Sequence, residues 1–283
     1  MKIVIIGAGS SSFGRGIIAD VLACPELEQK ECFLFLVDSN PESLQTMFQF
    51  AQALKEFHRR KIRIEATVDR KEALVAADYV ITSVARHRYS FWSQDFFLPL
   101  TFGFRQIYGE NGGPGAAFHT LRSLHLMLPS CQDMENLCPQ ALLLNFTNPE
   151  SRVCLGIKKL TRIRAVGLGH GPKMTLRIIA RILDQPEENL CLTVGGLNHF
   201  HWVLTLKERK TDQNLYPQLR EKIEEKPKLL PPLARELFFS FGLLPFPVDS
   251  HIGEYIGQAY YICGVLPGLK MLARPIREET SSA

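Results

Sequence analysis

Long apolar runs are missing from this sequence of 283 residues. No stretch reaches the roughly 18 consecutive apolar residues that a membrane-spanning helix needs. The N-terminus has a single lysine before a four-residue apolar run, Ile3–Ile6, which is too short for the apolar region of a signal peptide. We therefore expect no membrane partner and a cytoplasmic location.

The sequence also lacks cysteine pairs of the CxxC type and any strong excess of one charge. Its seven cysteines are scattered singly, which is typical of reduced thiols in the cytosol rather than of a disulfide framework. Its 33 basic and 29 acidic side chains leave a formal net charge of +4, and the basic residues are dispersed. We therefore expect no nucleic-acid partner.

Ordinary globular composition is present, with 46% hydrophobic and 22% charged residues. Short apolar runs without alternation are typical of strands buried on both faces of a parallel sheet, and stretches with helical spacing separate them. These patterns predict a doubly wound, Rossmann-like α/β domain over residues 1–195 and a second, incomplete α+β substrate domain over 196–283. The predicted strands lie at 3–6, 33–37, 62–66, 79–84, 141–144, 164–168 and 190–194.

A glycine-rich turn follows the first predicted strand, at Gly7, Ala8, Gly9, Ser10 and Ser11. Such a strand-to-helix turn binds a dinucleotide pyrophosphate through backbone N–H groups, although Ser12 stands where the fingerprint has its third glycine. Asp38 ends the second strand, where a carboxylate would accept bonds from ribose hydroxyls and favour NAD over NADP. The alternative is a tight turn with a capping aspartate.

Further polar residues follow later strands. We assign Asn145 to the cofactor site because it ends a strand, where ligands of open α/β sheets bind. Asn148, restricted by the following proline, would present its amide to a sugar hydroxyl or act only as a turn former. Arg86 and Arg88 would pair with a phosphate or a uronate carboxylate, or lie in solvent.

Five motifs in a fixed order resemble glycoside hydrolase family 4, from residue 1 to about 262. They are Gly7-Ala8-Gly9-Ser10-Ser11, Glu110-Asn111-Gly112-Gly113-Pro114-Gly115, Asn145-Phe146-Thr147-Asn148-Pro149, Gly167-Leu168-Gly169-His170-Gly171 and Gly196-Leu197-Asn198-His199.

The resemblance implies a glycosidase that uses NAD catalytically, without net redox change. In this family the sugar C3 hydroxyl is oxidised, a base removes the acidified C2 proton, the glycosidic oxygen leaves C1, water adds, and C3 is reduced again. A divalent metal, typically manganese, polarises the C2 and C3 oxygens. The implied substrate is a small glycoside.

The resemblance also assigns roles to single residues. His199 matches the metal-binding histidine, but Gly169 stands where the family has its cysteine ligand. There are three alternatives. His199 finds other metal ligands, with His170, His201 and a carboxylate as candidates, or the site works without tightly bound metal, or catalysis is lost. A histidine at position 170 resembles the residue found in the subgroup that acts on unphosphorylated α-linked sugars or uronides. We count His170 with the catalytic residues.

Two carboxylates complete the implied catalytic set. Glu110 matches a catalytic or orienting carboxylate, and its alternative role is to cap the following helix. Asp249 lies in a segment that resembles the one carrying the family's base. Glu254 and Tyr255 of the same segment would instead line the pocket, or all three would pack the start of a helix.

After about Cys263 the resemblance fades, whereas family chains continue further. We therefore expect a shortened chain whose exposed apolar surface favours a homo-oligomer. A non-catalytic NAD-binding remnant or sensor is one alternative. A malate- or lactate-type dehydrogenase is a weaker one, because no Asp-Arg element stands in a suitable place between Asn148 and His170.

Overall fold

The computed structural model describes residues 1–11, 13–29, 31–257 and 259. Ser12 and the end of the second predicted domain, 260–283, lie outside the described residues. The chain forms two compact units, of which unit 1 contains residues 1–88 and 120–168, and unit 2 contains 89–119 and the described residues from 169 onward. None of the described helices has the length and apolar character that crossing a bilayer requires.

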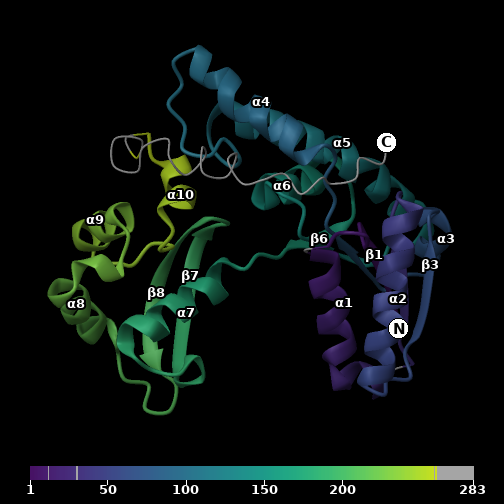
Figure 1. Cartoon of the computed structure of the whole chain (residues 1–283), viewed down its shortest axis with the longest axis horizontal. Coiled ribbons are helices and arrows are strands. Elements are labelled where there is room, and N and C mark those ends of the chain that lie inside the picture. The colour runs from purple at the N-terminus through teal and green to yellow at the C-terminus, as the bar shows by residue number, and fades with distance from the viewer. Residues whose placement is uncertain (12, 30, 258, 260–283) are drawn as a thin grey trace. The chain divides into compact units, whose positions relative to one another are not determined.

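Unit 1, whose helices α1, α2 and α3 are labelled in Figure 1, contains a six-stranded parallel sheet in the order β3-β2-β1-β4-β5-β6. This order is that of the doubly wound dinucleotide-binding fold, so the predicted fold class is confirmed. The strands are β1 (Lys2–Ile6), β2 (Phe33–Val37), β3 (Arg63–Thr67), β4 (Tyr79–Thr82), β5 (Leu142–Asn145) and β6 (Arg164–Gly167).

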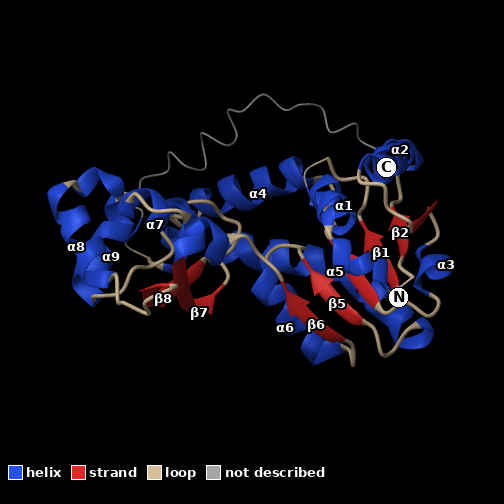
Figure 2. Ribbon diagram, turned by 90° about the horizontal axis from the view of Figure 1, so that it is seen from below, coloured by secondary structure: helices blue, strands red, loops and turns tan. Residues whose placement is uncertain are grey.

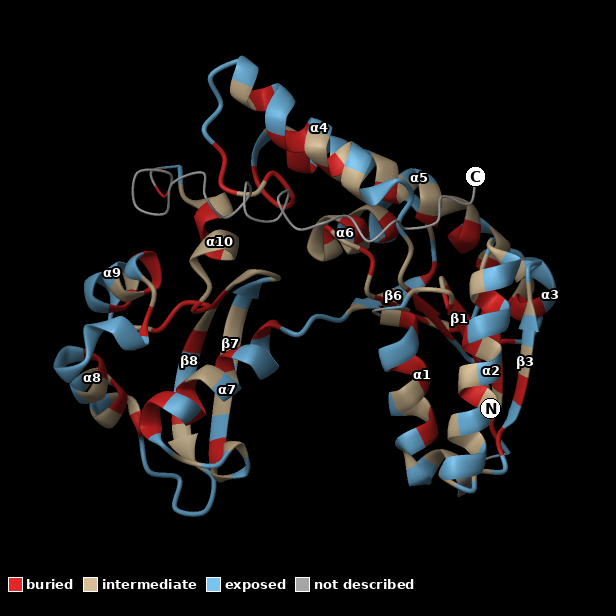
Figure 3. Cartoon of the chain, in the orientation of Figure 1, coloured by how far each residue is buried: buried red, intermediate tan, exposed pale blue. Residues whose placement is uncertain are grey.

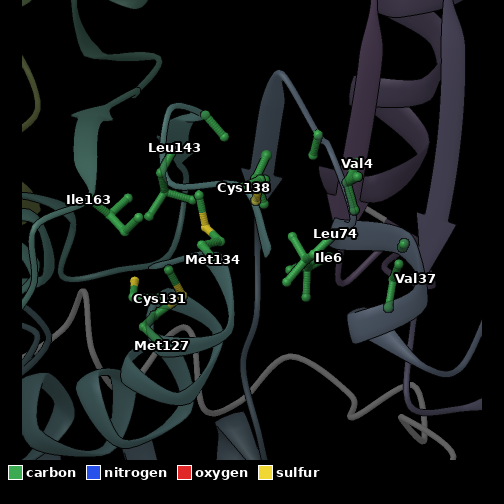
Figure 4. Close-up of a cluster of buried hydrophobic side chains, with 14 of the residues drawn as sticks. Val4, Ile6, Val37, Leu74, Met127, Cys131, Met134, Cys138, Leu143 and Ile163 are labelled. Carbon is green, nitrogen blue, oxygen red and sulfur yellow. The ribbon is translucent and has the colours of Figure 1, made fainter. Parts of the chain in front are cut away.

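Alternate residues of these strands point to the two faces of the sheet and enter two separate apolar clusters. On one face, Val4 and Ile6 pack with α3 (Arg70–Leu74), α5 (Gly113–Leu137) and α6 (Glu150–Leu160), and Figure 4 shows this cluster. On the other face, Ile3 and Ile5 pack with α1 (Phe13–Ala23) and α2 (Pro41–Phe57). Burial on both faces explains the continuous apolar runs in the sequence.

Unit 2 is built around an antiparallel pair, β7 (Leu190–Leu197) and β8 (Phe200–Glu208), drawn in red in Figure 2. Leu190 and Val203 of this pair form a buried apolar cluster with Phe238. Figure 3 draws the buried residues of the chain in red. The helices of this unit are α4 (Arg88–Thr101), α7 (Gly171–Leu183), α8 (Tyr216–Glu225), α9 (Pro232–Phe241) and α10 (Asp249–Ile252). Short 3-10 turns lie at Pro25–Gln29 in unit 1 and at Glu187–Asn189, Pro227–Leu229 and Gly253–Tyr255 in unit 2.

The compact units differ from the division that the sequence suggested after residue 195. The apolar run at 190–194 does not join the parallel sheet, because it pairs with β8 as part of β7. A boundary at 195 would cut this strand. Residues 89–119 also pack with the later part of the chain, which is a long-range association that no local pattern in the sequence indicates.

Candidate functional site

The glycine-rich loop of unit 1 leaves the sheet between β1 and β4, where the strand order reverses. Gly7 has φ +87°, and a Cβ there would lie 2.2 Å from the Ser83 carbonyl oxygen. The Val37 carbonyl accepts hydrogen bonds from the N–H groups of Gly7 and Ala8, at 2.9 and 3.0 Å. Only glycine fits at position 7, and the loop is held at the edge where such sheets bind their ligands.

Asp38, which follows the end of β2, stabilises this loop through hydrogen bonds. Its Oδ2 accepts a hydrogen bond from the Gly9 backbone N–H at 2.9 Å, and its Oδ1 accepts one from Asn40 N–H at 2.9 Å. Each carboxylate oxygen has more than one lone pair, so these bonds leave acceptor capacity for a ribose hydroxyl. The structure therefore adds a positioning role to the one predicted for Asp38.

Gly14, in the first turn of α1 directly after this loop, is a residue that the sequence analysis missed. A Cβ at Gly14 would lie 2.2 Å from the Ala8 carbonyl oxygen. Close packing of helix and strand is the role of the third glycine in the dinucleotide fingerprint. The signal was present, because a glycine two residues after Ser12 supplies the same close approach with a longer spacing.

The other residues assigned to unit 1 occupy different surroundings. The Ser10 hydroxyl accepts a bond from Phe13 N–H at the start of α1, while Ser11 is exposed. Asn145 is fully buried, and its side chain bonds Thr82 and the Thr147 backbone. It ties β4 to the loop after β5, so a direct contact with a cofactor, as predicted, does not agree with its burial.

The residues predicted to bind substrate in unit 1 lie nearer the surface. Asn148 is half-buried, and its carbonyl oxygen accepts a hydrogen bond from the Ser123 hydroxyl at 2.6 Å. Arg86 and Arg88 follow β4 and are both exposed. Their placement after a strand end agrees with the predicted position, and their role as substrate-binding residues stays a prediction.

In unit 2, His199 lies in the two-residue turn that joins β7 to β8. Its backbone has φ +66°, a conformation that histidine adopts more readily than most side chains but that remains uncommon. The Asn111 side chain contacts the ring, because the Nδ1 atom of His199 lies 2.9 Å from the Asn111 amide nitrogen. The His251 and Phe246 rings pack beside it, with centroids at 4.6 and 6.5 Å.

Glu254 connects the 110–111 loop to the segment after α10. Its two carboxylate oxygens accept hydrogen bonds from the backbone N–H groups of Glu110 and Asn111, at 2.7 and 2.8 Å. Its Oε2 also accepts one from the Asn111 amide at 3.1 Å. Burial, with the nearby Glu110 charge as a smaller cause, raises the pKa of Glu254 to about 7 although these N–H donors oppose the shift.

The histidines of this cluster are held uncharged. Burial lowers the pKa of His199 to about 4, with smaller contributions from His251 and His201. Burial also lowers the pKa of His201 to about 4 and lowers that of His251. His201 is buried with its Nε2 3.0 Å from the Thr175 hydroxyl, so this alternative ligand already has a polar partner.

The predicted catalytic residues are placed in three different ways. Glu110 is 7% exposed and adjoins Asn111. His170 is exposed at the N-terminus of α7 and makes no capping bond there with its side chain. Asp249 accepts hydrogen bonds from Leu233 and Ala234 N–H, at 2.8 Å each. Both of its oxygens cap α9, which is the helix-packing alternative and does not favour its prediction as a base.

A metal ion does not fit the side chains around His199. Among the described residues, no three His, Cys, Asp or Glu side chains lie close enough together to hold one. A Cβ at Gly169 would lie 2.9 Å from Asn198 Oδ1, so the Asn198 side chain lies where a ligand at position 169 would begin. The Nδ1 atom of His199 already faces the Asn111 amide.

Residues 2–185 match the profile of the family 4 glycosyl hydrolases, and residues 194–280 match that of their C-terminal domain. The chain belongs to glycoside hydrolase family 4. The resemblance deduced from the five motifs is therefore confirmed. An α-glucosidase from Erwinia rhapontici is 31% identical over 91% of this chain and 66% of its own length. An α-galactosidase from Bacillus subtilis is 30% identical over 92% of this chain and 60% of its own length.

The fold is shared with solved structures of the family. A 6-phospho-α-glucosidase from gut microorganisms, in complex with NAD and Mn²⁺, superimposes with a TM-score of 0.74 at 22% identity. The match covers 95% of this chain and 62% of that protein. The chain thus spans about three fifths to two thirds of the length of these family 4 proteins.

Proposed function

We propose that this chain is an NAD-dependent glycosidase that acts on a small, α-linked, unphosphorylated sugar or uronide. The observation that carries the proposal is its family 4 membership over residues 2–185, which include the glycine-rich loop and the Glu110 segment. The relatives at 30% and 31% identity are named α-galactosidase and α-glucosidase, and His170 favours the unphosphorylated class. Family membership supports this activity over that of a malate- or lactate-type dehydrogenase.

The loop of unit 1 fits a dinucleotide. Glycine at positions 7 and 14 lets the loop follow a tight path at the carboxyl end of β1, where a pyrophosphate would lie near the N-terminus of α1, and Asp38 offers acceptors to ribose hydroxyls. NAD, when bound there, supplies the transient oxidation of the sugar at C3. A carboxylate at position 38 repels a 2′-phosphate, so we expect selection against NADP.

In unit 2, this chain's own residues orient the sugar and move protons. Glu110, shielded from water, is the proposed general acid for the departing glycosidic oxygen. His199 offers its ring Nε2 atom to a sugar oxygen, because its Nδ1 is engaged by Asn111. No step is assigned to a metal, since the donor set around His199 does not fit one.

Release of nitrophenol from aryl α- and β-glycosides and glycosiduronides tests the proposal. NAD and manganese are each added or withheld. We expect turnover of an α-glycoside or uronide that requires NAD and does not respond to manganese. Absence of turnover, with NAD binding detected by calorimetry, would favour the alternative of a nucleotide-binding remnant.

We also propose a cytoplasmic homo-oligomer. The end of α4 and the loop after it expose four large apolar side chains within eight residues. Contact with a second copy of this chain would bury these side chains and remove them from water. They are Phe97, Leu98, Phe102 and Phe104. Light scattering tests this, and a monomer at micromolar concentration would contradict it.

A further inference from the structure

We propose that Asn111 and Glu254 hold His199 as an uncharged imidazole that carries its proton on Nε2, so that this chain's sugar site works without a metal ion. The inference deepens the proposed function and depends on it only for naming the ligand as a sugar. It assigns positioning roles to Asn111 and Glu254.

Glu254 fixes which end of the Asn111 amide faces which partner. A carboxylate only accepts hydrogen bonds, and both Glu254 oxygens already accept from backbone N–H groups. At pH 7.5, where Glu254 is mostly ionised, the Asn111 side-chain atom 3.1 Å from Oε2 is therefore the amide nitrogen. If the amide were flipped, its oxygen would face a carboxylate oxygen, which is a repulsive contact.

Asn111 in turn fixes the proton on His199. The same amide nitrogen lies 2.9 Å from His199 Nδ1 and has a second hydrogen to donate. Nδ1 accepts this hydrogen only when it carries no proton. The neutral ring then carries its proton on Nε2, and the imidazolium form, with two N–H donors, would face a third donor at Asn111.

This arrangement opposes metal binding at both ring nitrogens. The Nδ1 lone pair is used by Asn111, and Nε2 carries the proton. Freeing Nε2 for a metal would move the proton to Nδ1, where two N–H donors would then face each other. Gly169 adds no ligand, and the described residues contain no group of three candidate ligands. The site therefore presents an N–H donor in place of a Lewis acid.

The backbone supports the same role. Residue 199 keeps a positive φ in the tight turn between β7 and β8, and such strain persists where surrounding contacts determine it. The Asn111 bond and the packing of Phe246 and His251 supply these contacts. A fixed, neutral Nε2–H donor is suited to polarise a sugar oxygen as negative charge develops on it.

Long-range ¹H–¹⁵N spectra of the full chain, labelled with ¹⁵N-histidine, test this directly at pH 7.5. The His199 signal is identified by its loss in His199→Gln. We expect the pattern of an Nε2–H tautomer, and no saturable broadening when Mn²⁺ alone is added up to 1 mM, roughly the upper end of useful affinities. An Nδ1–H or imidazolium pattern would overturn the inference, as would saturable Mn²⁺ broadening at His199.

Asn111→Asp supplies the converse test, and Asn214→Asp is its matched control. A carboxylate at position 111 accepts a hydrogen bond rather than donating one, so we expect Nδ1 of His199 to become protonated. We expect the affinity for Mn²⁺ to rise at least about tenfold, which corresponds to about 1.4 kcal/mol. Asn214 is exposed in unit 2, and its Oδ1 acceptor for Tyr216 N–H is kept in the aspartate. An unchanged tautomer in folded Asn111→Asp would contradict the inference.

These readouts separate this inference from the proposed function. The tautomer and the Mn²⁺ response are measured without substrate or NAD. If Asn111→Asp does not fold, the wild-type spectrum alone decides. A wild-type chain with the Nε2–H tautomer but without glycosidase activity would contradict the proposed function and leave the hydrogen-bond network as described.

Discussion

The two units position their polar groups by different means. In unit 1 the loop after β1 is held by backbone groups and by Asp38, whose bond to Gly9 spans 29 residues of sequence. In unit 2, Glu254 accepts a hydrogen bond from the Glu110 N–H, which lies 144 residues away in the sequence. His199 contacts the Asn111 amide, which lies 88 residues away in the sequence. The proposed nucleotide loop is thus specified by local sequence, whereas the proposed sugar site depends on contacts that only the whole fold creates.

The units also differ in electrostatics. In unit 2, three imidazoles with lowered pKa values lie in one cluster with a glutamate whose pKa is raised. The loop of unit 1 depends instead on close backbone contacts at Gly7 and Gly14. Unit 1 should therefore be most sensitive to added volume, and unit 2 to changes of charge.

Gly14→Ala is expected to have the largest effect. Its new Cβ would lie 2.2 Å from a backbone carbonyl that cannot rotate away, so we expect a loss of about 3 kcal/mol in the free energy of unfolding and weaker NAD binding. Urea unfolding and calorimetry measure the two effects. A variant with wild-type stability would contradict the tight packing of α1 on the loop.

Asp249→Asn separates a capping role from a catalytic one in unit 2. Asparagine keeps one acceptor for the α9 backbone, so we expect a stability loss of about 1 to 2 kcal/mol and a kcat within about tenfold of wild type. Asp184→Asn, which removes an exposed carboxylate at the end of α7, is the control. A fall in kcat of several orders of magnitude with unchanged stability would instead identify Asp249 as the base.

His201→Gln tests the charge sensitivity of unit 2. Since burial lowers the pKa of His201 from 6.5 to about 4, its contribution to stability is present above pH 6.5 and is lost as the pH falls toward 4. Glu254 has the opposite effect, because its raised pKa removes stability as the pH rises from 4.5 to about 7.

We expect His201→Gln to reduce the pH slope of stability between pH 4 and 6.5 by up to about 1 kcal/mol per pH unit. Urea unfolding at several pH values measures it. A slope equal to that of the wild type would show that this histidine titrates alike in the folded and unfolded chain.

Gly16→Ala is expected to have the smallest effect, and it is the matched control for Gly14→Ala. Both glycines lie in α1, but a Cβ at Gly16 meets no atom within 4 Å. Because alanine favours helix over glycine, we expect a gain of about 0.5 to 1 kcal/mol. A loss as large as that at Gly14 would show that α1 tolerates no side chain at either position.

Local patterns in the sequence were sufficient for most of unit 1. The buried runs at 3–6 and 33–37, the Gly7 turn and the Asp38 strand end each depend on neighbours within one βαβ unit, and all appear where predicted. The run at 190–194 was assigned to the wrong sheet, because an apolar run does not show which strand it will pair with.

The candidate site of unit 2 was predictable only in part. Family motifs identified Glu110 and His199, but not the partners that hold them. Asn111 lies inside the Glu110-Asn111-Gly112 motif, but the motif predicted no role for it, and Glu254 was predicted only as an alternative to Asp249. The spacing of Asp249 and Glu254 does not reveal that one caps α9 while the other holds the 110–111 loop, since both contacts depend on tertiary packing.

The most direct test of the account is turnover of an aryl α-glycoside or glycosiduronide in D₂O, with NAD present and metals removed by EDTA. We predict release of the sugar with deuterium at C2 and no net accumulation of NADH, because the proposed mechanism deprotonates C2 while C3 is transiently oxidised. Hydrolysis that proceeds without NAD, or a product without deuterium at C2, would contradict the account.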